Sequence, residues 1–139
     1  MTLQTVLGFD YGTRRIGVAT GQTITASATP LTTISSINQK PDWAAIGQLI
    51  EQWKPDALIV GLPTYLDGSP SEMTEKALKF SRQLQGRYNL PVHTVNESLS
   101  SFEAEQALQQ HKKIGQHNKQ EIDKMAAAII VQSWLEQNL

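Results

Sequence analysis

The chain has 139 residues, 40% hydrophobic and 18% charged, as in an ordinary globular protein, and this length predicts one compact domain over residues 1–139. The net charge of −1 excludes an overall basic surface, so any nucleic-acid contact must come from a local patch. The absence of cysteine excludes disulfides and thiolate metal sites, and no apolar run reaches membrane-spanning length, so we expect a cytoplasmic protein without membrane contacts.

Short apolar segments at the start of the chain predict three strands. A tight turn joins residues 6–10 to residues 15–20, which predicts an antiparallel pair, and residues 24–34 predict a third strand. Pro41 suits the first position of the helix that follows. In that helix, apolar residues recur at helical spacing until the chain reaches Pro55.

The second half of the chain alternates strands and helices. Residues 57–62 and 91–95 are short apolar runs bounded by turn residues, which is typical of buried parallel strands. Capping residues predict helices that begin near Ser69, Ser100 and Asn118. The order predicts an α/β fold: a mixed five-stranded sheet of antiparallel hairpins followed by β-α-β crossovers, with helices on both faces.

The segment 7–19 reads Leu-Gly-Phe-Asp-Tyr-Gly-Thr-Arg-Arg-Ile-Gly-Val-Ala and carries the first candidate site residue. Asp10 ends the first strand, and Gly12 permits a positive φ or a close approach of the backbone to a ligand. Arg14 and Arg15 add positive charge beside the carboxylate, a combination that indicates phosphate and metal. An ordinary hairpin turn and the phosphate-holding loop of actin-like ATPases remain alternatives at this point.

Two further acids suit the same site. Glu97 directly follows the strand at residues 91–95 and its neighbour Asn96, and ligands of open α/β sheets bind at such strand ends; a solvated loop acid is the alternative. On the last helix, apolar residues follow Asp123 at spacings of three, four, seven and eleven, so Asp123 lies on the same face as this buried apolar stripe. A carboxylate that points toward the core needs a partner or a cation. The alternative is an acid that reaches water and suits the helix dipole.

Three carboxylates from distant segments can hold two Mg²⁺ or Mn²⁺ ions. Hard divalent cations prefer oxygen ligands, and a pair about 3.5–4 Å apart clamps the attacking and leaving oxygens of an in-line phosphodiester displacement. The substrate phosphates would be bound by basic and hydroxyl residues near the catalytic turn and near the start of the last helix. These are Thr13, Arg14, Arg15, Lys112, Lys113, Lys119 and Lys124.

Four ordered blocks of the sequence resemble the YqgF/RuvX-like family within the ribonuclease H-like superfamily. They are the segment 8–19, the Gly-Leu-Pro and Asp-Gly pairs within residues 61–68, Glu97 with its Ser-rich sequel, and residues 122–130. The resemblance implies a ribonuclease H-like fold and a metal-dependent nuclease, with Asp10, Glu97 and Asp123 matching the acidic triad. Family members are described as nucleases of the 5′ end of pre-16S rRNA and, earlier, as Holliday junction resolvases.

The resemblance therefore implies nucleic-acid partners: structured RNA such as precursor rRNA, or branched DNA, with ribosomal particles as further partners of a monomer or weak homodimer. The chain departs from the family where Asn96 and Ser98 replace the usual Asp and Arg. This departure leaves open a nucleic-acid-binding protein without turnover. A nucleotide-binding module of the actin-like type is the third reading, but it needs a second lobe that 139 residues do not supply.

Overall fold

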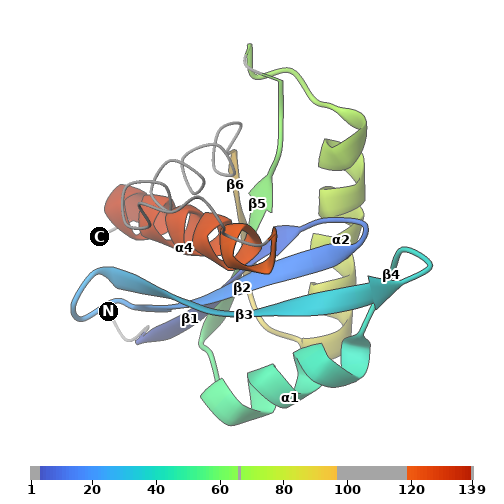
Figure 1. The fold of residues 1–139 in the computed structure, drawn as a ribbon. Helices are drawn as coiled ribbons and strands as arrows, with labels where there is room; N and C mark the ends of the chain where they lie inside the picture. The colour runs from blue at the N-terminus through green and yellow to red at the C-terminus, as the bar shows by residue number, and fades with distance from the viewer. Residues whose placement is uncertain (1–3, 66, 97–118, 139) are drawn as a thin grey trace, which may run out of the picture.

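The computed structural model describes residues 4–65, 67–96 and 119–138. Its strands and helices follow in chain order: β1 (Thr5–Tyr11), β2 (Arg15–Gln22), β3 (Ser27–Ile37), β4 (Lys40–Pro41), α1 (Trp43–Trp53), β5 (Ala57–Leu62), α2 (Glu72–Tyr88), β6 (Val92–Asn96) and α4 (Lys119–Asn138). The strands form one sheet in the order β4-β3-β2-β1-β5-β6 (Figure 1).

The sheet is mixed, as the sequence predicts. Strands β1 to β4 pair antiparallel with their neighbours along the chain, whereas β5 and β6 run parallel to β1. The three parallel strands therefore end at the same edge of the sheet, and β1 lies in the middle. The predicted α/β architecture with helices on both faces is confirmed, although the strand count of five was one too low.

The additional strand, β4, comes from a hairpin that the sequence analysis missed. Asn38 and Gln39 both have positive φ angles, 52° and 62°, the backbone of a two-residue type I′ turn. Pro41 then lies in an edge strand, where a missing N–H costs no ladder hydrogen bond, and the prediction that it begins a helix was wrong. Asp42 caps α1 instead, because its side chain accepts a hydrogen bond from the backbone N–H of Ala45.

Two other boundaries also differ from the prediction. The third strand covers Ser27–Ile37, three residues later than expected at both ends. Helix α2 begins after Ser71, which forms a capping box with Thr74. Ser69, the predicted cap, donates instead to the Asp67 carboxylate from both its backbone N–H and its hydroxyl. Ser69 and Ser71 are both suitable cap residues, and Ser69 is instead held by its hydrogen bonds to Asp67.

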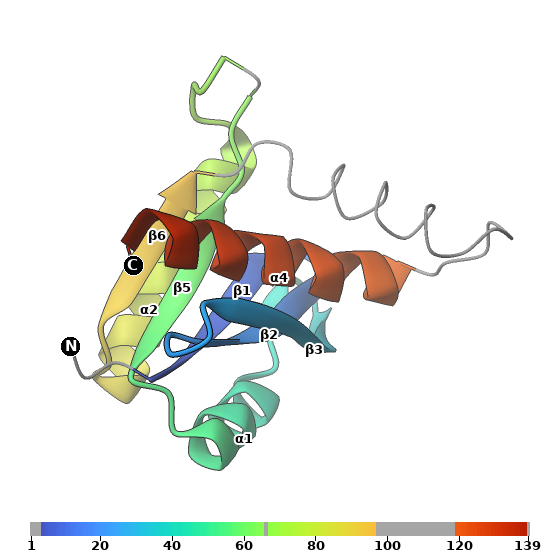
Figure 2. The ribbon, with the colours of Figure 1, turned by 90° about the vertical axis from the view of Figure 1, so that its left-hand side faces the viewer.

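Each face of the sheet carries its own hydrophobic core. Leu7 and Phe9 of β1 belong to the core under α1 and α2, whereas Val6 belongs to the core under α4. Figures 1 and 2 show α4 lying across one face, with α1 and α2 on the other. Successive residues of a strand alternate between faces, so this division fixes the face of every β1 side chain.

Helix α4 lies very close to the sheet because small residues meet there. A Cβ atom on Gly8 would come within 2.0 Å of Val131 in α4, which only glycine avoids. Three consecutive alanines of α4, residues 126–128, are buried on the same helix. None of the helices in the described part of the chain is long and apolar enough to cross a lipid bilayer.

Candidate active site

Asp10 lies near the carboxyl end of β1, on the face covered by α4. Its neighbour Phe9 is in the opposite core, so alternation directs the Asp10 side chain toward α4. Its cross-strand partner in β2 is Gly17. The small partner leaves room beside the carboxylate at the point where α4 crosses the sheet.

Asp123 enters this space from α4. A Cβ atom on Gly17 would lie 2.0 Å from the backbone carbonyl oxygen of Asp123, so the helix backbone rests directly on β2 here. Because Gly17 is also the partner of Asp10, the two carboxylates belong to the same small region of the sheet. Asp10 and Asp123 are 113 positions apart in the sequence, and both lie beside Gly17.

The electrostatics of Asp10 reflect this proximity. Burial raises the pKa of its carboxyl from 3.8 to about 7, and the negative charge of Asp123 acts in the same direction. The side chain keeps partial exposure at the sheet edge, but the protein around it removes much of the water that would solvate its charge. Asp10 therefore holds a proton far more readily than a surface carboxyl does.

Arg15 makes the charge contact of the site. Its Nε donates a hydrogen bond of 2.7 Å to Oδ2 of Asp123, and both side chains are partly buried. Arg15 was predicted to bind substrate phosphate, and this ion pair was not predicted. The spacing offered a signal, because Arg15 and Gly17 are two residues apart in one strand and so share the Asp10 face.

The other predicted site residues are spread around this pair. Thr13 and Arg14 lie in the turn between β1 and β2, with Arg14 exposed, and Lys124 forms an ion pair of 3.3 Å with Glu121. Lys119 is the first residue of α4. Glu97, Lys112 and Lys113 lie outside the described residues. Within the described ranges, no group of three or more acidic, histidine or cysteine side chains is close enough to hold a metal ion.

Comparison with known families decides the relationship. The family described as "RuvX: Holliday junction resolvase" matches residues 4–137. The chain belongs to the RuvX family. A relative from Pseudomonas putida, named "Putative pre-16S rRNA nuclease", is 50% identical over 137 residues, which cover 98% of this chain and 97% of the relative. A relative with the same name from Azotobacter vinelandii is 49% identical over 94% of this chain and 92% of its own length.

Solved structures place this RuvX family member among the resolvases by fold. RuvC from Thermus thermophilus, in complex with a Holliday junction substrate, has a TM-score of 0.55 at 14% identity and covers 96% of this chain and 94% of its own. The fowlpox virus resolvase in complex with Holliday junction DNA has a TM-score of 0.59 at 13% identity, with 98% and 99% covered. The predicted ribonuclease H-like fold is confirmed.

Proposed function

We propose that this RuvX family member is a metal-dependent endonuclease that hydrolyses RNA phosphodiester bonds at the 5′ end of precursor 16S rRNA. The observation that carries the proposal is the pairing of Asp10 and Asp123 at the end of the central strand, with the pKa of Asp10 raised to about 7. A buried carboxyl beside a second carboxylate is a site prepared for a cation. The names of the relatives support the RNA substrate and the process.

We expect Asp10, Glu97 and Asp123 to hold a pair of Mg²⁺ or Mn²⁺ ions. Glu97 follows β6 directly in sequence, and β6 is two strands from β1 in the sheet. At the ~4.8 Å spacing of neighbouring strands, the two strands are about 10 Å apart. A carboxylate of β1 and one that follows β6 in sequence would hold the ions between them.

The protein groups divide the remaining work. Asp10 would give up its proton when a cation binds, because its pKa of about 7 reflects a buried carboxylate with another negative charge beside it. Arg15 balances the charge of the Asp123 carboxylate through the 2.7 Å contact from its Nε atom, so a bound cation would compete with Arg15 for this carboxylate. Arg14, exposed in the turn beside Asp10, is free to bind the phosphate that flanks the scissile bond. When bound, the two ions supply an activated water and neutralise the leaving oxygen.

Further phosphate contacts are proposed for Thr13, Lys112, Lys113, Lys119 and Lys124, which adjoin the turn and the start of α4 in sequence. The chain would work in the cytoplasm, as a monomer or weak homodimer, and would meet its RNA free or in a ribosomal particle. Contacts with phosphates recognise the RNA backbone rather than the bases. The cleavage position would then depend on the shape of the RNA.

The test is cleavage of a precursor 16S transcript with its 5′ leader, in Mn²⁺ or Mg²⁺, with the new ends mapped by primer extension. We expect cuts at the 5′ boundary by the wild type and none by Asp10→Asn or Glu97→Gln. Glu136→Gln, which changes an exposed acid at the far end of α4, serves as the matched control and should cleave normally. Equal cleavage by Asp10→Asn, or no cleavage by folded wild type with either metal, rejects the proposal.

The resolvase fold supports a second candidate, cleavage of branched DNA. A four-way junction offered under the same conditions separates the two. If kcat/KM for the junction exceeds that for the rRNA precursor tenfold or more, DNA is the substrate. Binding of either nucleic acid without any cut, in the presence of metal, identifies the chain as a binding protein on a nuclease scaffold.

A further inference from the structure

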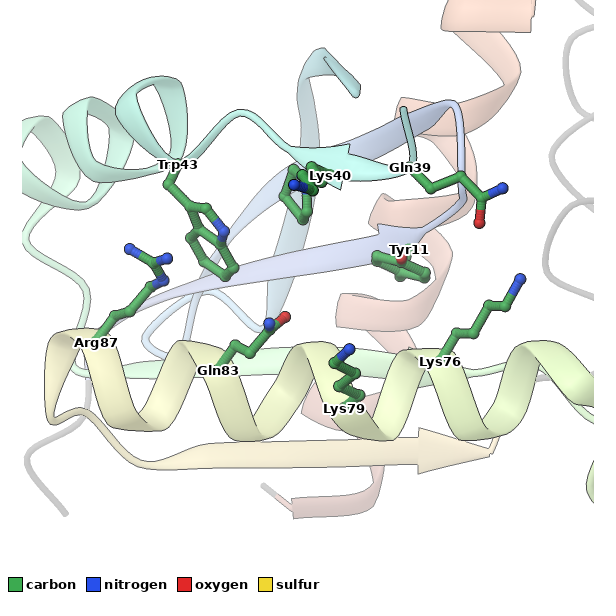
Figure 3. A pocket seen from close by; sticks show the side chains of 9 residues that line it. Tyr11, Gln39, Lys40, Trp43, Lys76, Lys79, Gln83 and Arg87 are labelled. Atoms are coloured by element: carbon green, nitrogen blue, oxygen red, sulfur yellow. The ribbon is translucent and has the colours of Figure 1, made fainter. Parts of the chain in front are cut away.

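A cavity of about 580 Å³ opens on the sheet face opposite Asp10. Its wall is formed by Tyr11 at the end of β1, by Lys40 and Trp43 before and within α1, and by one side of α2 (Figure 3). Tyr11 follows Asp10 directly, and alternation along β1 turns the two side chains to opposite faces. The cavity and the candidate active site therefore meet at the same strand end.

The cavity concentrates positive charge. Lys40, Lys76, Lys79 and Arg87 line it, and none of its lining residues is acidic. The whole chain has 12 basic and 13 acidic residues, so one third of its basic side chains gather here. Among the described residues, none of these four cations forms an ion pair with a carboxylate. Their charge is available to an anionic ligand.

The cations on α2 form a row rather than a single pocket. Lys76, Lys79, Gln83 and Arg87 follow one another at spacings of three or four residues, so they share one side of the helix, and Figure 3 shows them directed toward Tyr11 and Trp43. At 1.5 Å rise per residue the row is roughly 16 Å long. A row of this length suits several successive phosphates of one unpaired strand.

Aromatic rings complete the cavity wall. Phe80 packs beneath both Tyr11 and Trp43, with ring centroids 5.0 Å and 5.7 Å away, and this fixes the orientation of the two rings. The Arg87 guanidinium lies 4.1 Å from the Trp43 ring centroid. Fixed rings beside a row of cations are the arrangement that binds single-stranded nucleic acid, where bases stack on rings and cations follow the backbone.

We propose that this cavity binds the single-stranded segment of RNA adjoining the bond cleaved on the Asp10 face. The strand passes around the end of β1, with its phosphates along α2 and a base against Tyr11. A base paired within a duplex is not free to stack there, so the site selects unpaired RNA. This inference rests on the proposed function for the identity of the nucleic acid, but binding in the cavity requires neither metal nor cleavage.

The test compares two fluorescein-labelled hairpin RNAs, one with a ten-nucleotide single-stranded tail and one without, by fluorescence anisotropy in EDTA. Lys76→Gln/Lys79→Gln removes two cations from the cavity. Lys54→Gln/Arg82→Gln makes the same change of charge at exposed positions that do not line it. We expect the cavity variant to lose about tenfold in affinity for the tailed RNA only. The slope of log affinity against log salt concentration (the salt slope) should fall in magnitude by about 1.4, since each phosphate contact contributes about 0.7 for single strands.

Three results would overturn the inference. They are an unchanged affinity of the cavity variant, an equal loss in both double variants, and equal competition by poly-glutamate of matched charge. The single variant Lys79→Gln, at an exposed position, should show half of the change in slope and guards against a folding defect. With 4-thiouridine in the tail, cross-links should map to Tyr11 or to residues 39–43, and cross-links confined to other segments count against the cavity.

The outcome is independent of catalysis. In EDTA, where no cut is made, the wild type should already bind the tailed RNA more tightly than the untailed one. If no RNA is ever cleaved but the tail dependence is observed, the cavity stands and the nuclease proposal fails. If cleavage occurs but both hairpins bind equally well, the nuclease proposal stands and the cavity is not the binding site of the tail.

Discussion

Burial and the neighbouring Asp123 carboxylate both raise the pKa of the Asp10 carboxyl. Arg15 forms an ion pair with Asp123 and not with Asp10. The sequence identified both acids as candidates, Asp10 from its place at a strand end and Asp123 from its place on the apolar side of a helix. It did not indicate that Arg15 would pair with one of them. The strand spacing places Arg15 on the Asp10 face, but the partner of Arg15 depends on where α4 crosses β2, and no local pattern records that crossing point.

The raised pKa makes stability depend on pH. The folded state holds the Asp10 proton up to about pH 7, whereas the unfolded chain loses it near 3.8. This group therefore stabilises the fold fully below pH 4, and its contribution is lost as the pH rises to 7, by an amount on the order of 4 kcal/mol. Urea unfolding of Asp10→Asn should show a gain over the wild type that grows from pH 4.5 to pH 7.5. A gain that is equal at both pH values contradicts the shift.

Replacing Arg15 tests the second charge of the site. Arg15→Gln removes the partner of Asp123, and for a partly exposed pair we expect a loss of about 1 kcal/mol in unfolding free energy. The uncompensated carboxylate should then attract a divalent cation more strongly. The rise in melting temperature on adding Mg²⁺ should thus be larger than in the wild type, and a smaller rise would show that Arg15 supports the metal site rather than competing with it.

Among the elements, strands β1, β2, β5 and β6 follow the predicted segments closely because turn residues bound each of them. Strand β6 is an edge strand in which only Val95 is buried, so the prediction of a buried strand there was wrong. The β3–β4 hairpin was missed because its turn is Asn38-Gln39 rather than a glycine-containing pair, and because Pro41 suits an edge strand as well as a helix start. Local sequence favours both structures at Pro41. The pairing with Ser36 in β3 decides between them.

The approach of α4 to β2 gives an element-scale prediction. Gly17→Ala would drive a methyl group into the backbone carbonyl of Asp123, so we expect a loss of about 1–3 kcal/mol in stability and a displaced Asp123. Gly86→Ala, in α2 with no neighbour within 4 Å, is the control and should stabilise by about 0.5–1 kcal/mol. Chemical unfolding measures both. Equal effects of the two changes would show that the α4 contact is not tight.

For the whole molecule, the sequence predicted the family and the α/β fold, because its motifs lie in order along nearly the full chain. The cationic cavity could not be predicted in this way. Lys40 and Lys79 belong to separate elements, each an ordinary exposed lysine in its own segment, and only the packing of α2 beside the β4–α1 connection brings them together. The net charge of −1 for the whole chain does not reveal that lysine and arginine side chains cluster on one surface.

A metal site shared by distant segments should stabilise the whole fold. The proposed Mg²⁺ or Mn²⁺ site exists only in the folded chain, so the melting temperature of the wild type should rise with the metal concentration. Asp10→Asn should rise much less, since it lacks one of the proposed ligands. Differential scanning calorimetry measures both, and equal shifts in the two proteins would place the metal elsewhere.

Side chains of β1 alternate between the two faces of the sheet, and this limits which sequence changes the strand can accept during evolution. Asp10 faces α4 and Tyr11 faces the cationic cavity, so a single inserted or deleted residue in β1 would exchange them. The carboxyl would then meet lysines, and the phenol ring would meet Asp123. The Asp10 site and the cationic cavity therefore both depend on the length of β1. We expect related chains to differ in this strand by substitution, and to differ in length only in the loops.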